Sequence, residues 1–328
     1  MKKNKKYVVR MVVAVAASST LGAANAAEPQ YPTKSVRMIV PFAPGGPTDV
    51  IARFVAAKLS ESFGHQVVID NRAGAGGNIG MGMGASATPD GYTLTIVSSS
   101  FVVNPGLYAK IPYDPYTSFA PVTNMAASPN VYTAHPSVAA KSMPELIKLI
   151  QANPKKYSFA TPGIGTTPHF TAELFKKMAD IDITHVPYRG VAAGAMSDLL
   201  TNRIDSMFNT TGSLLQAVRS GQVRGLAQST PQRSPLAPEL PTFAEAGVPG
   251  FNVSSWYGLF VPAKTPPDIV KKMHDDTAKM LTEPETKKKY EVLGIEAASA
   301  TADQMAALMK NEIALWTPII KAANIKGE

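Results

Sequence analysis

The chain has 328 residues, of which 45% are hydrophobic, and it contains no cysteine. Its formal net charge is +8, but five of the 32 basic residues and none of the 24 acidic ones lie in residues 1–26, so the remainder carries only +3. This composition excludes disulfides and thiolate chemistry. The scattered lysines argue against nucleic-acid binding, which needs a clustered basic patch.

The first 26 residues have the pattern of a secretory signal. A basic start between Lys2 and Arg10 precedes the apolar run Met11–Ala17, and Ala24-Asn25-Ala26 fits a small-x-small cleavage site. The apolar run is shorter than the roughly 20 residues that span a bilayer. We therefore predict cleavage after Ala26 and a periplasmic protein, with a retained N-terminal anchor as the alternative.

Two segments share one local pattern, in which a short apolar strand is followed by a glycine-rich turn and an amphipathic helix. The strand Met38–Val40 leads through PFAPGGP to a helix from about Thr48. The strand Tyr157–Ala160 leads through TPGIGTT to a helix from about Pro168. Exposed backbone N–H groups and a helix N-terminus suit an anion. Two such sites predict a ligand held at both ends between two lobes.

Apolar runs alternate with helical patterns along the whole chain, which predicts an α/β fold. The predicted strands are Val36–Pro41, Val67–Asp70, Thr93–Val97, Val131–Thr133, Tyr157–Ala160, Ile183–Val186, Ser206–Phe208, Gly225–Ala227 and Ser255–Val261. Besides the helix after the first glycine turn, the predicted helical stretches are Met143–Ala152, Thr171–Met178, which belongs to the helix after the second turn, Ala192–Leu200, Ser213–Ser220, Pro266–Tyr290 and Ala302–Ala323.

The strand Ser255–Val261, which follows the middle of the chain, favours a lobe built from both ends. We predict a first lobe of residues 27–125 plus 255–328 and a second lobe of residues 126–254. Two consecutive domains are the alternative.

Candidate binding residues gather in the two turns. In the first turn, Gly45 and Gly46 would present backbone N–H groups, and Thr48 would cap the helix or donate its hydroxyl to a ligand. In the second turn, the backbone of Gly163 and Gly165 and the hydroxyls of Thr161 and Thr166 would do the same. His169, in the first turn of the following helix, is either a packed side chain or a ligand donor.

Further candidates follow predicted strands, where α/β folds place their ligands. Ser98 begins a run of three serines at one strand end, and Arg189 follows the strand Ile183–Val186. Arg189 would bind a carboxylate through two hydrogen bonds or pair with a surface acid. Trp256 and Tyr257 form either a cleft wall or part of the core.

Several enzyme signatures are absent from the sequence. It has neither a Gly-Lys-Ser/Thr phosphate loop nor a Gly-x-Ser-x-Gly elbow, and its five histidines lack close metal-ligand spacing. The run Gly74–Gly80 resembles a dinucleotide-binding loop, but Ile79 stands where the third glycine belongs. We interpret this run as a turn packed close to the cleft, and we predict neither a metal nor a cofactor.

An ordered set of motifs over the whole chain after residue 26 resembles the Bug-type, TctC-like receptors of tripartite tricarboxylate transporters. The motifs that carry the resemblance are Tyr31-Pro32, Val40–Gly46, Asn71–Gly80, Pro89–Leu94, Gly163–Thr166 with His169, Val186–Gly190, Pro241–Gly247 and Ser255–Phe260. The resemblance implies a two-lobed, type II-like periplasmic binding protein whose cleft closes on a small carboxylated ligand. It places ligand contacts on Phe42 to Gly46 and Thr48, Ser98, Thr161 to Thr166, and Tyr188 to Gly190, and so adds Phe42, Ala43, Tyr188 and Gly190 to the candidates.

We therefore predict a non-enzymatic, monomeric receptor for a small organic anion. Its partner would be the integral membrane permease of a tripartite transporter, or a sensor. The alternative is an exported hydrolase or isomerase that acts on a small carboxylate through Asp49, His169 or Arg189.

Overall fold

The computed structural model describes residues 31–188 and 194–327, and residues from Tyr31 onward form one compact unit. The predicted signal segment, its cleavage site, Arg189 and Gly190 lie outside the described residues. Within this part of the chain, no helix combines the length and apolar character needed to cross a membrane.

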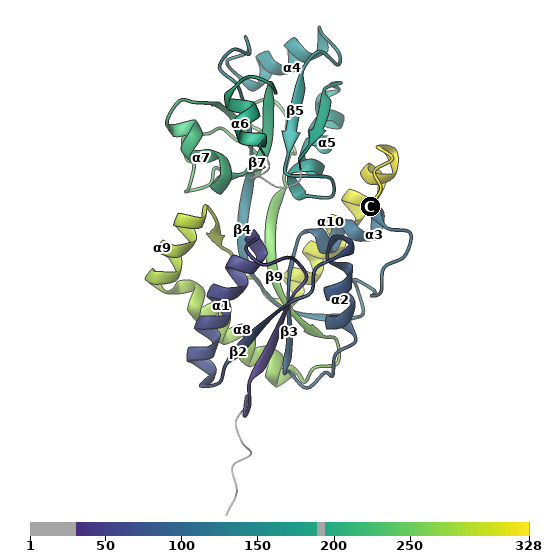
Figure 1. Ribbon diagram of the computed structural model, residues 1–328, viewed down its shortest axis with the longest axis vertical. Coiled ribbons are helices and arrows are strands. Elements are labelled where there is room, and N and C mark those ends of the chain that lie inside the picture. Colours follow the sequence, from purple (N-terminus) through teal and green to yellow (C-terminus); the bar gives the residue numbers. More distant parts are fainter. Residues whose placement is uncertain (1–30, 189–193, 328) are drawn as a thin grey trace, which may run out of the picture. The chain divides into compact units, whose positions relative to one another are not determined.

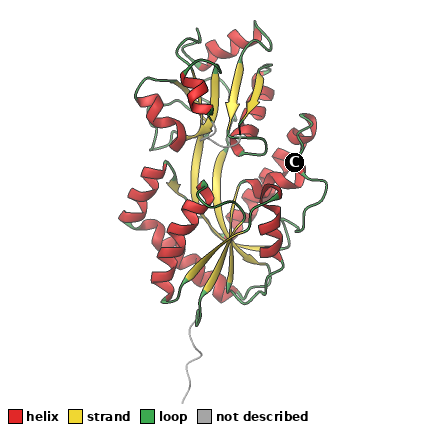
Figure 2. Cartoon of the chain, in the orientation of Figure 1, coloured by secondary structure: helices red, strands yellow, loops and turns green. Residues whose placement is uncertain are grey.

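The first half of the unit is built on parallel strands with helices on both faces (Figure 2). β1 (Val36–Val40) pairs in parallel with β2 (Val67–Asn71) and β3 (Thr93–Ser98), and β9 (Ser254–Pro262) then adds antiparallel to β3. The short β10 (Glu296–Ala297) pairs with β4 (Phe119–Ala134).

The second half repeats this arrangement around the far end of β4. β7 (Ser206–Thr210) and β8 (Arg224–Gln228) pair antiparallel with β4, and β7 continues in parallel to β5 (Ser158–Thr161), which pairs with β6 (Thr184–Pro187). The carboxyl ends of β5, β6 and β7 therefore lie at one edge of this half.

β4 and β9 are the two strands that belong to both halves (Figure 1). They pair antiparallel from Phe119 opposite Pro262 to Pro129 opposite Ser254, with register shifts between Pro121 and Thr123 and between Asn124 and Ala126. The fold is thus two-lobed, and the chain passes between the lobes along a two-stranded ribbon rather than through loops.

Helices fill the connections. In chain order they are α1 (Pro47–Phe63), the 3₁₀ turn η1 (Ala75–Gly77), α2 (Asn78–Ala85), α3 (Ser100–Leu107), α4 (Met143–Gln151), α5 (Thr167–Ala179), α6 (Ala195–Leu200), α7 (Thr211–Arg219), α8 (Pro267–Thr282), α9 (Pro284–Leu293) and α10 (Ala302–Ala322). The helical stretch predicted for Pro266–Tyr290 is divided in two, because Pro284 at the start of α9 cannot continue the backbone ladder of α8.

α2 and α3 were not predicted and β4 was predicted only in part, because glycine or proline interrupts each of these elements. α2 carries three glycines, and a Cβ on Gly84 would lie 2.2 Å from Thr95 Oγ1 of β3, so close packing excludes a side chain there. Only Val131–Thr133 of β4 was predicted, since Pro121 and Pro129 lie within the strand. Proline is tolerated at a bulge, and one register shift lies directly at Pro121.

Separate apolar clusters cover the two faces of the first half. Ile51, Val55 and Leu59 of α1 pack with Met273 and Met280 of α8 against one face of the sheet. The other face carries α2, α3 and α10, with Phe101 of α3 and Trp316 of α10 at 0% and 2% exposure. Ile51, Val55 and Leu59 thus form the buried side of α1, whereas Ser62 is exposed.

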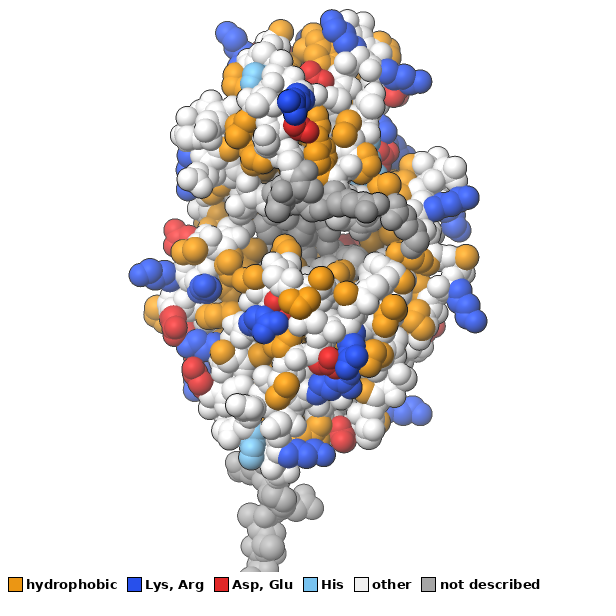
Figure 3. Space-filling view, viewed as in Figure 1, with side chains coloured by type: hydrophobic (Ala, Val, Ile, Leu, Met, Phe, Trp, Pro, Cys, Tyr) orange, Lys and Arg blue, Asp and Glu red, His pale blue; other side chains and the backbone are white. Residues whose placement is uncertain are grey.

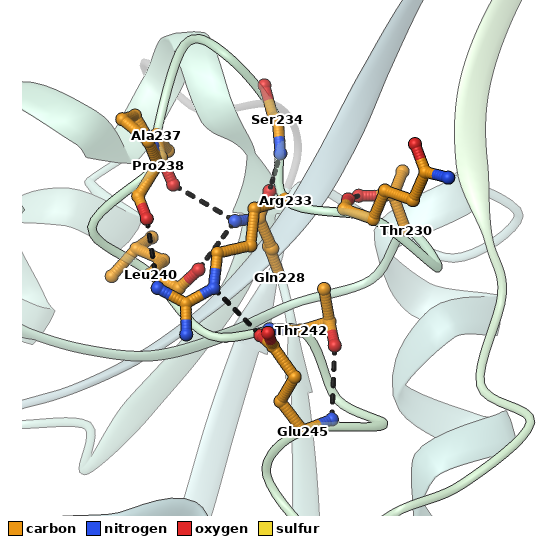
Figure 4. A network of polar contacts seen from close by, with 10 residues as sticks. Gln228, Thr230, Arg233, Ser234, Ala237, Pro238, Leu240, Thr242 and Glu245 are labelled. Atoms are coloured by element: carbon orange, nitrogen blue, oxygen red, sulfur yellow. Dashed lines mark hydrogen bonds and ion pairs between the residues drawn. The ribbon is translucent and has the colours of Figure 1, made fainter.

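The proline-rich segment after β8 is held in place by hydrogen bonds to the buried Gln228 side chain (Figure 4). The buried Gln228 amide donates to the carbonyls of Ala237 and Leu240 at 3.0 and 2.7 Å and accepts from Ser234 N at 2.8 Å. At the surface, Arg233 Nε donates to Glu245 Oε2 at 2.8 Å. The segment is irregular but fixed.

Candidate functional site

A cavity of about 770 Å³ lies where strand ends from both halves meet. Its lining comes from the turns and helix starts that follow these strands, and from β9 and the C-terminus. The lining residues are Phe42, Pro47, Thr48, Ala75, Gly76, Ser98–Ser100, Asn104, Leu107, Tyr108, Pro162–Pro168, Pro187, Tyr188, Asn209, Thr210, Ser213, Ser255, Tyr257 and Gly327. None of these described residues is an acid, a histidine, a lysine or an arginine.

Four helices begin at this cavity. The starts of α1 and α3 line it from the first half, and those of α5 and α7 line it from the second. In the described structure no side chain caps these four helices through a hydrogen bond at the N-cap residue. The first N–H groups of a helix lack intrahelical acceptors and carry partial positive charge, so the described lining is electropositive although none of its side chains is charged.

The second glycine turn has the backbone shape that exposes its N–H groups. Gly163 and Gly165 have φ values of +149° and +82°, which side chains disfavour. The Thr166 hydroxyl donates to Gly163 O at 2.7 Å and closes the turn upon itself. The turn then enters α5 through Thr167 and Pro168, both of which line the cavity.

The first turn is held by a buried carboxylate. Asp49 Oδ2 accepts from Gly45 N at 2.9 Å and from Arg53 Nε at 2.8 Å, and Asp49 Oδ1 accepts from Asn71 Nδ2 at 2.9 Å. Burial opposes ionisation, but the hydrogen bonds from Arg53, Gly45 and Asn71 outweigh it and lower the pKa of the Asp49 carboxyl. Asp49 therefore holds the shape of the first turn.

Hydroxyl groups join the two halves across the cavity. Ser99, at the end of β3, hydrogen-bonds through its hydroxyl with the Thr167 hydroxyl at the start of α5. Beside it, the Ser98 and Ser100 hydroxyls lie 3.0 Å apart. The contact between Ser99 and Thr167 directly connects the serine run after β3 with the second glycine turn.

Asn209, at the end of β7, is a cavity residue that sequence reasoning missed. Its Oδ1 accepts from Thr210 N at 2.8 Å, while its buried Nδ2 has no hydrogen-bond acceptor among the described residues. An unpaired buried donor is costly, so a donor beside a cavity points to a ligand acceptor. The sequence does contain the strand–turn–helix pattern at this position, because a predicted strand, a polar turn and a predicted helix follow one another as they do at the two glycine turns.

Two stacked histidines lie behind the second turn. The rings of His169 and His185 are 4.4 Å apart at 15°, and Thr161 Oγ1 lies 2.7 Å from His185 Nε2. Burial, His185 and Lys176 lower the pKa of His169 to about 3, and burial and Lys176 lower that of His185 to about 4. Both imidazoles are therefore neutral, and they line a second cavity of about 390 Å³.

The structure brings seven of the fourteen predicted residues to the first cavity. These are Phe42, Thr48, Ser98, Gly163, Gly165, Thr166 and Tyr188. Ala43, Gly45 and Gly46 belong to the first turn without lining the cavity, and Thr161 and His169 lie behind the second turn.

The remaining sequence alternatives divide between cavity and core. Tyr257 lines the cavity, whereas Trp256 is buried in the core and donates from Nε1 to Glu312 Oε2 at 2.9 Å. Ala75 and Gly76 line the cavity, as expected for a glycine turn packed close to the cleft.

A two-lobed α/β unit with a cavity at the strand ends defines a solute-binding protein of the periplasmic type. The sequence model of the tripartite tricarboxylate transporter family receptor matches residues 51–325. The chain belongs to this receptor family, whose location is the periplasm.

Similar proteins agree with this assignment. A protein from the tcbD–tcbE intergenic region of Pseudomonas sp. (strain P51) is 38% identical over 88% of this chain and 86% of its own length. A structure of R. palustris Rpa4515 with adipate is 35% identical, with a TM-score of 0.77 over 90% of this chain and 99% of that one. The periplasmic binding protein BugD is 34% identical, with a TM-score of 0.74 over 91% of this chain and 100% of that one.

Proposed function

We propose that this receptor binds a small carboxylated organic anion, a mono- or dicarboxylate, in the cavity of about 770 Å³. The observation that carries the proposal is the convergence of four helix N-termini on a cavity whose described lining has no charged side chain. Helix N-termini bind carboxylates through backbone N–H groups. The adipate in the similar R. palustris structure supports a ligand of this class.

In this proposal the second turn and Asn209 hold one carboxylate. The N–H groups at the start of α5 and Asn209 Nδ2 supply donors. The first turn, with Phe42 and Thr48, closes from the opposite side, and Arg189 and Gly190 remain predicted contacts. Backbone donors in fixed turns lose little conformational freedom on binding, which favours affinity.

Closure would be a bend of the ribbon formed by β4 and β9. We propose residues 27–125 plus 255–328 as one lobe and residues 126–254 as the other. The Ser99–Thr167 contact would form as the lobes approach and break as they separate.

The remaining proposals concern location and partners. Residues 1–26 would direct export and be removed after Ala26, and the monomeric receptor would deliver its ligand to a membrane permease or signal to a sensor. The charge-free described lining supports a receptor over a hydrolase or isomerase, since it offers no acid or histidine as a general base beside a nucleophile.

The test measures the Tm of the purified, exported protein at increasing concentrations of adipate, malate or benzoate. A bound ligand stabilises the folded state by about 2.7 kcal/mol at a hundredfold excess over Kd, so we expect the Tm to rise by several degrees. Asn209→Asp replaces the donor with an anionic acceptor and should abolish the rise. Asn202→Asp, the same change at an exposed turn that lines neither cavity, should preserve it.

Two outcomes would overturn the proposal. One is the absence of a Tm shift with every carboxylate together with turnover of an ester or amide. The other is an equal response of the wild type and Asn209→Asp.

A further inference from the structure

Three metal-ligating side chains meet behind the second turn, outside the ligand cavity. His169 and Glu173 are four residues apart on α5 and so share one face of the helix, and His185 faces them from β6. One donor atom from each of the three lies within 4.8 Å of the other two. His185 lies on another element, so the sequence alone does not join it to the pair on α5.

The surroundings of the two imidazoles fit a ligand role. Metal-bound histidines use one ring nitrogen for the cation while the other is held by a hydrogen bond. Thr161 Oγ1 holds His185 Nε2 at 2.7 Å, which leaves Nδ1 available. Gly165 N donates to His169 Nδ1 at 3.4 Å, a long contact that competes weakly for the imidazole lone pair.

The donor set selects the class of cation. Two imidazoles and one carboxylate suit Zn²⁺, Co²⁺ or Ni²⁺, whereas Mg²⁺ and Ca²⁺ prefer oxygen ligands. His169, Glu173 and His185 all border the cavity of about 390 Å³, which gives a cation an entry path and room for water as a fourth ligand.

Lys176 determines access to these ligands. Its ammonium lies 3.0 and 3.1 Å from the two carboxylate oxygens of Glu173, the position that a divalent cation would take. The Lys176 side chain is 26% exposed and long enough to turn outward. A metal ion would have to displace it.

We propose that His169, Glu173 and His185 form a binding site for one divalent transition-metal ion, with Lys176 as the competing cation. The bound metal ion would brace the start of the second turn, because Thr161 contacts His185. This site is independent of the carboxylate proposed for the first cavity.

The test measures metal binding to the untagged, exported protein. Calorimetry measures the binding of Zn²⁺, and visible absorption measures the binding of Co²⁺. We expect one ion per chain. Glu173→Gln and His185→Gln should each weaken binding more than about tenfold. His65→Gln, which changes a histidine outside this cluster and outside both cavities, should leave binding unchanged.

The variant Lys176→Gln distinguishes a metal site from a cluster that only stabilises the fold, because only a metal site predicts a change in metal affinity. It removes the competing ammonium and should tighten Zn²⁺ binding severalfold, even though the Lys176–Glu173 ion pair is lost. Binding of neither ion to the wild type and Lys176→Gln would overturn the proposal. So would undiminished binding to a folded His185→Gln protein, which would place the ion elsewhere.

Discussion

Replacement of Glu312 by glutamine should remove a pH-dependent part of the protein's stability. Glu312 lies on α10, and its carboxyl accepts from Trp256 Nε1 at 2.9 Å and from the Trp316 side chain. Burial raises the pKa of this carboxyl from 4.5 to about 7, against the smaller opposing effect of the two indole donors. The residue as a whole is partly exposed, but its carboxyl end lies between the two tryptophans.

The sign follows from the protons that each state binds. Between pH 4.5 and about 7 the folded protein retains a proton that the unfolded chain releases. The contribution of Glu312 to stability is therefore complete below pH 4.5 and is lost as the pH rises through about 7. This difference in pKa corresponds to at most about 3 kcal/mol, and the partial exposure of the residue makes that an upper bound.

Urea unfolding at about pH 5 and about pH 8 measures this contribution. Glu312→Gln keeps an acceptor for Trp256 but cannot ionise, so its free energy of unfolding should fall less between the two pH values than that of the wild type. Glu291→Gln, on the exposed side of α9, should behave like the wild type. An equal fall for the wild type and Glu312→Gln would refute the reasoning.

Three further changes test the two turns and the contact between the halves. Asp49→Ala removes the carboxylate that accepts from Gly45 and Asn71 and should lower the free energy of unfolding at neutral pH by about 1.5–3 kcal/mol, the range for a hydrogen bond to a charged group, as measured by urea unfolding. Because the pKa of Asp49 is lowered, its contribution is present above the usual value of 3.8 and is lost as the pH falls towards the folded-state pKa; an unchanged acid-unfolding curve in the variant would contradict this role. Gly165→Val forces a β-branched residue to φ +82° and should therefore reduce carboxylate affinity at least about tenfold, with an unchanged circular dichroism spectrum. Retained affinity would show that the turn only connects β5 to α5. Gly212→Ala places a Cβ 2.4 Å from Leu293 O and should lower the free energy of unfolding by about 1–3 kcal/mol, and a neutral result would show that α7 and α9 separate readily.

The sequence predicted much of the fold because most strands are short apolar runs bounded by turns. β4 was recognised only at Val131–Thr133, since its prolines lie at a bulge and at the passage between the halves, which only the pairing with β9 explains. α2 was missed because its glycines are required by close packing and not by local propensity.

The candidate site was predicted best where strand, turn and helix follow one another in the chain. The second turn met this condition, and three of its predicted residues line the cavity, namely Gly163, Gly165 and Thr166. Asn209 was missed because its polar turn, Asn209–Gly212, carries a single glycine and is not glycine-rich like the other two turns. The cluster of His169, Glu173 and His185 depends on α5 packing beside β6, a tertiary contact that no spacing along the chain encodes.

The pairing of Pro129 with Ser254 has a consequence for protein engineering. The chain leaves the first half and returns to it on neighbouring strands, so the two ends of the intervening segment lie side by side. A segment with adjacent ends can be exchanged or inserted without rearranging its host. We therefore expect that residues 130–253 can be exchanged as one unit. Replacing them with the corresponding segment of a relative would transfer one wall of the cavity and leave the other wall unchanged.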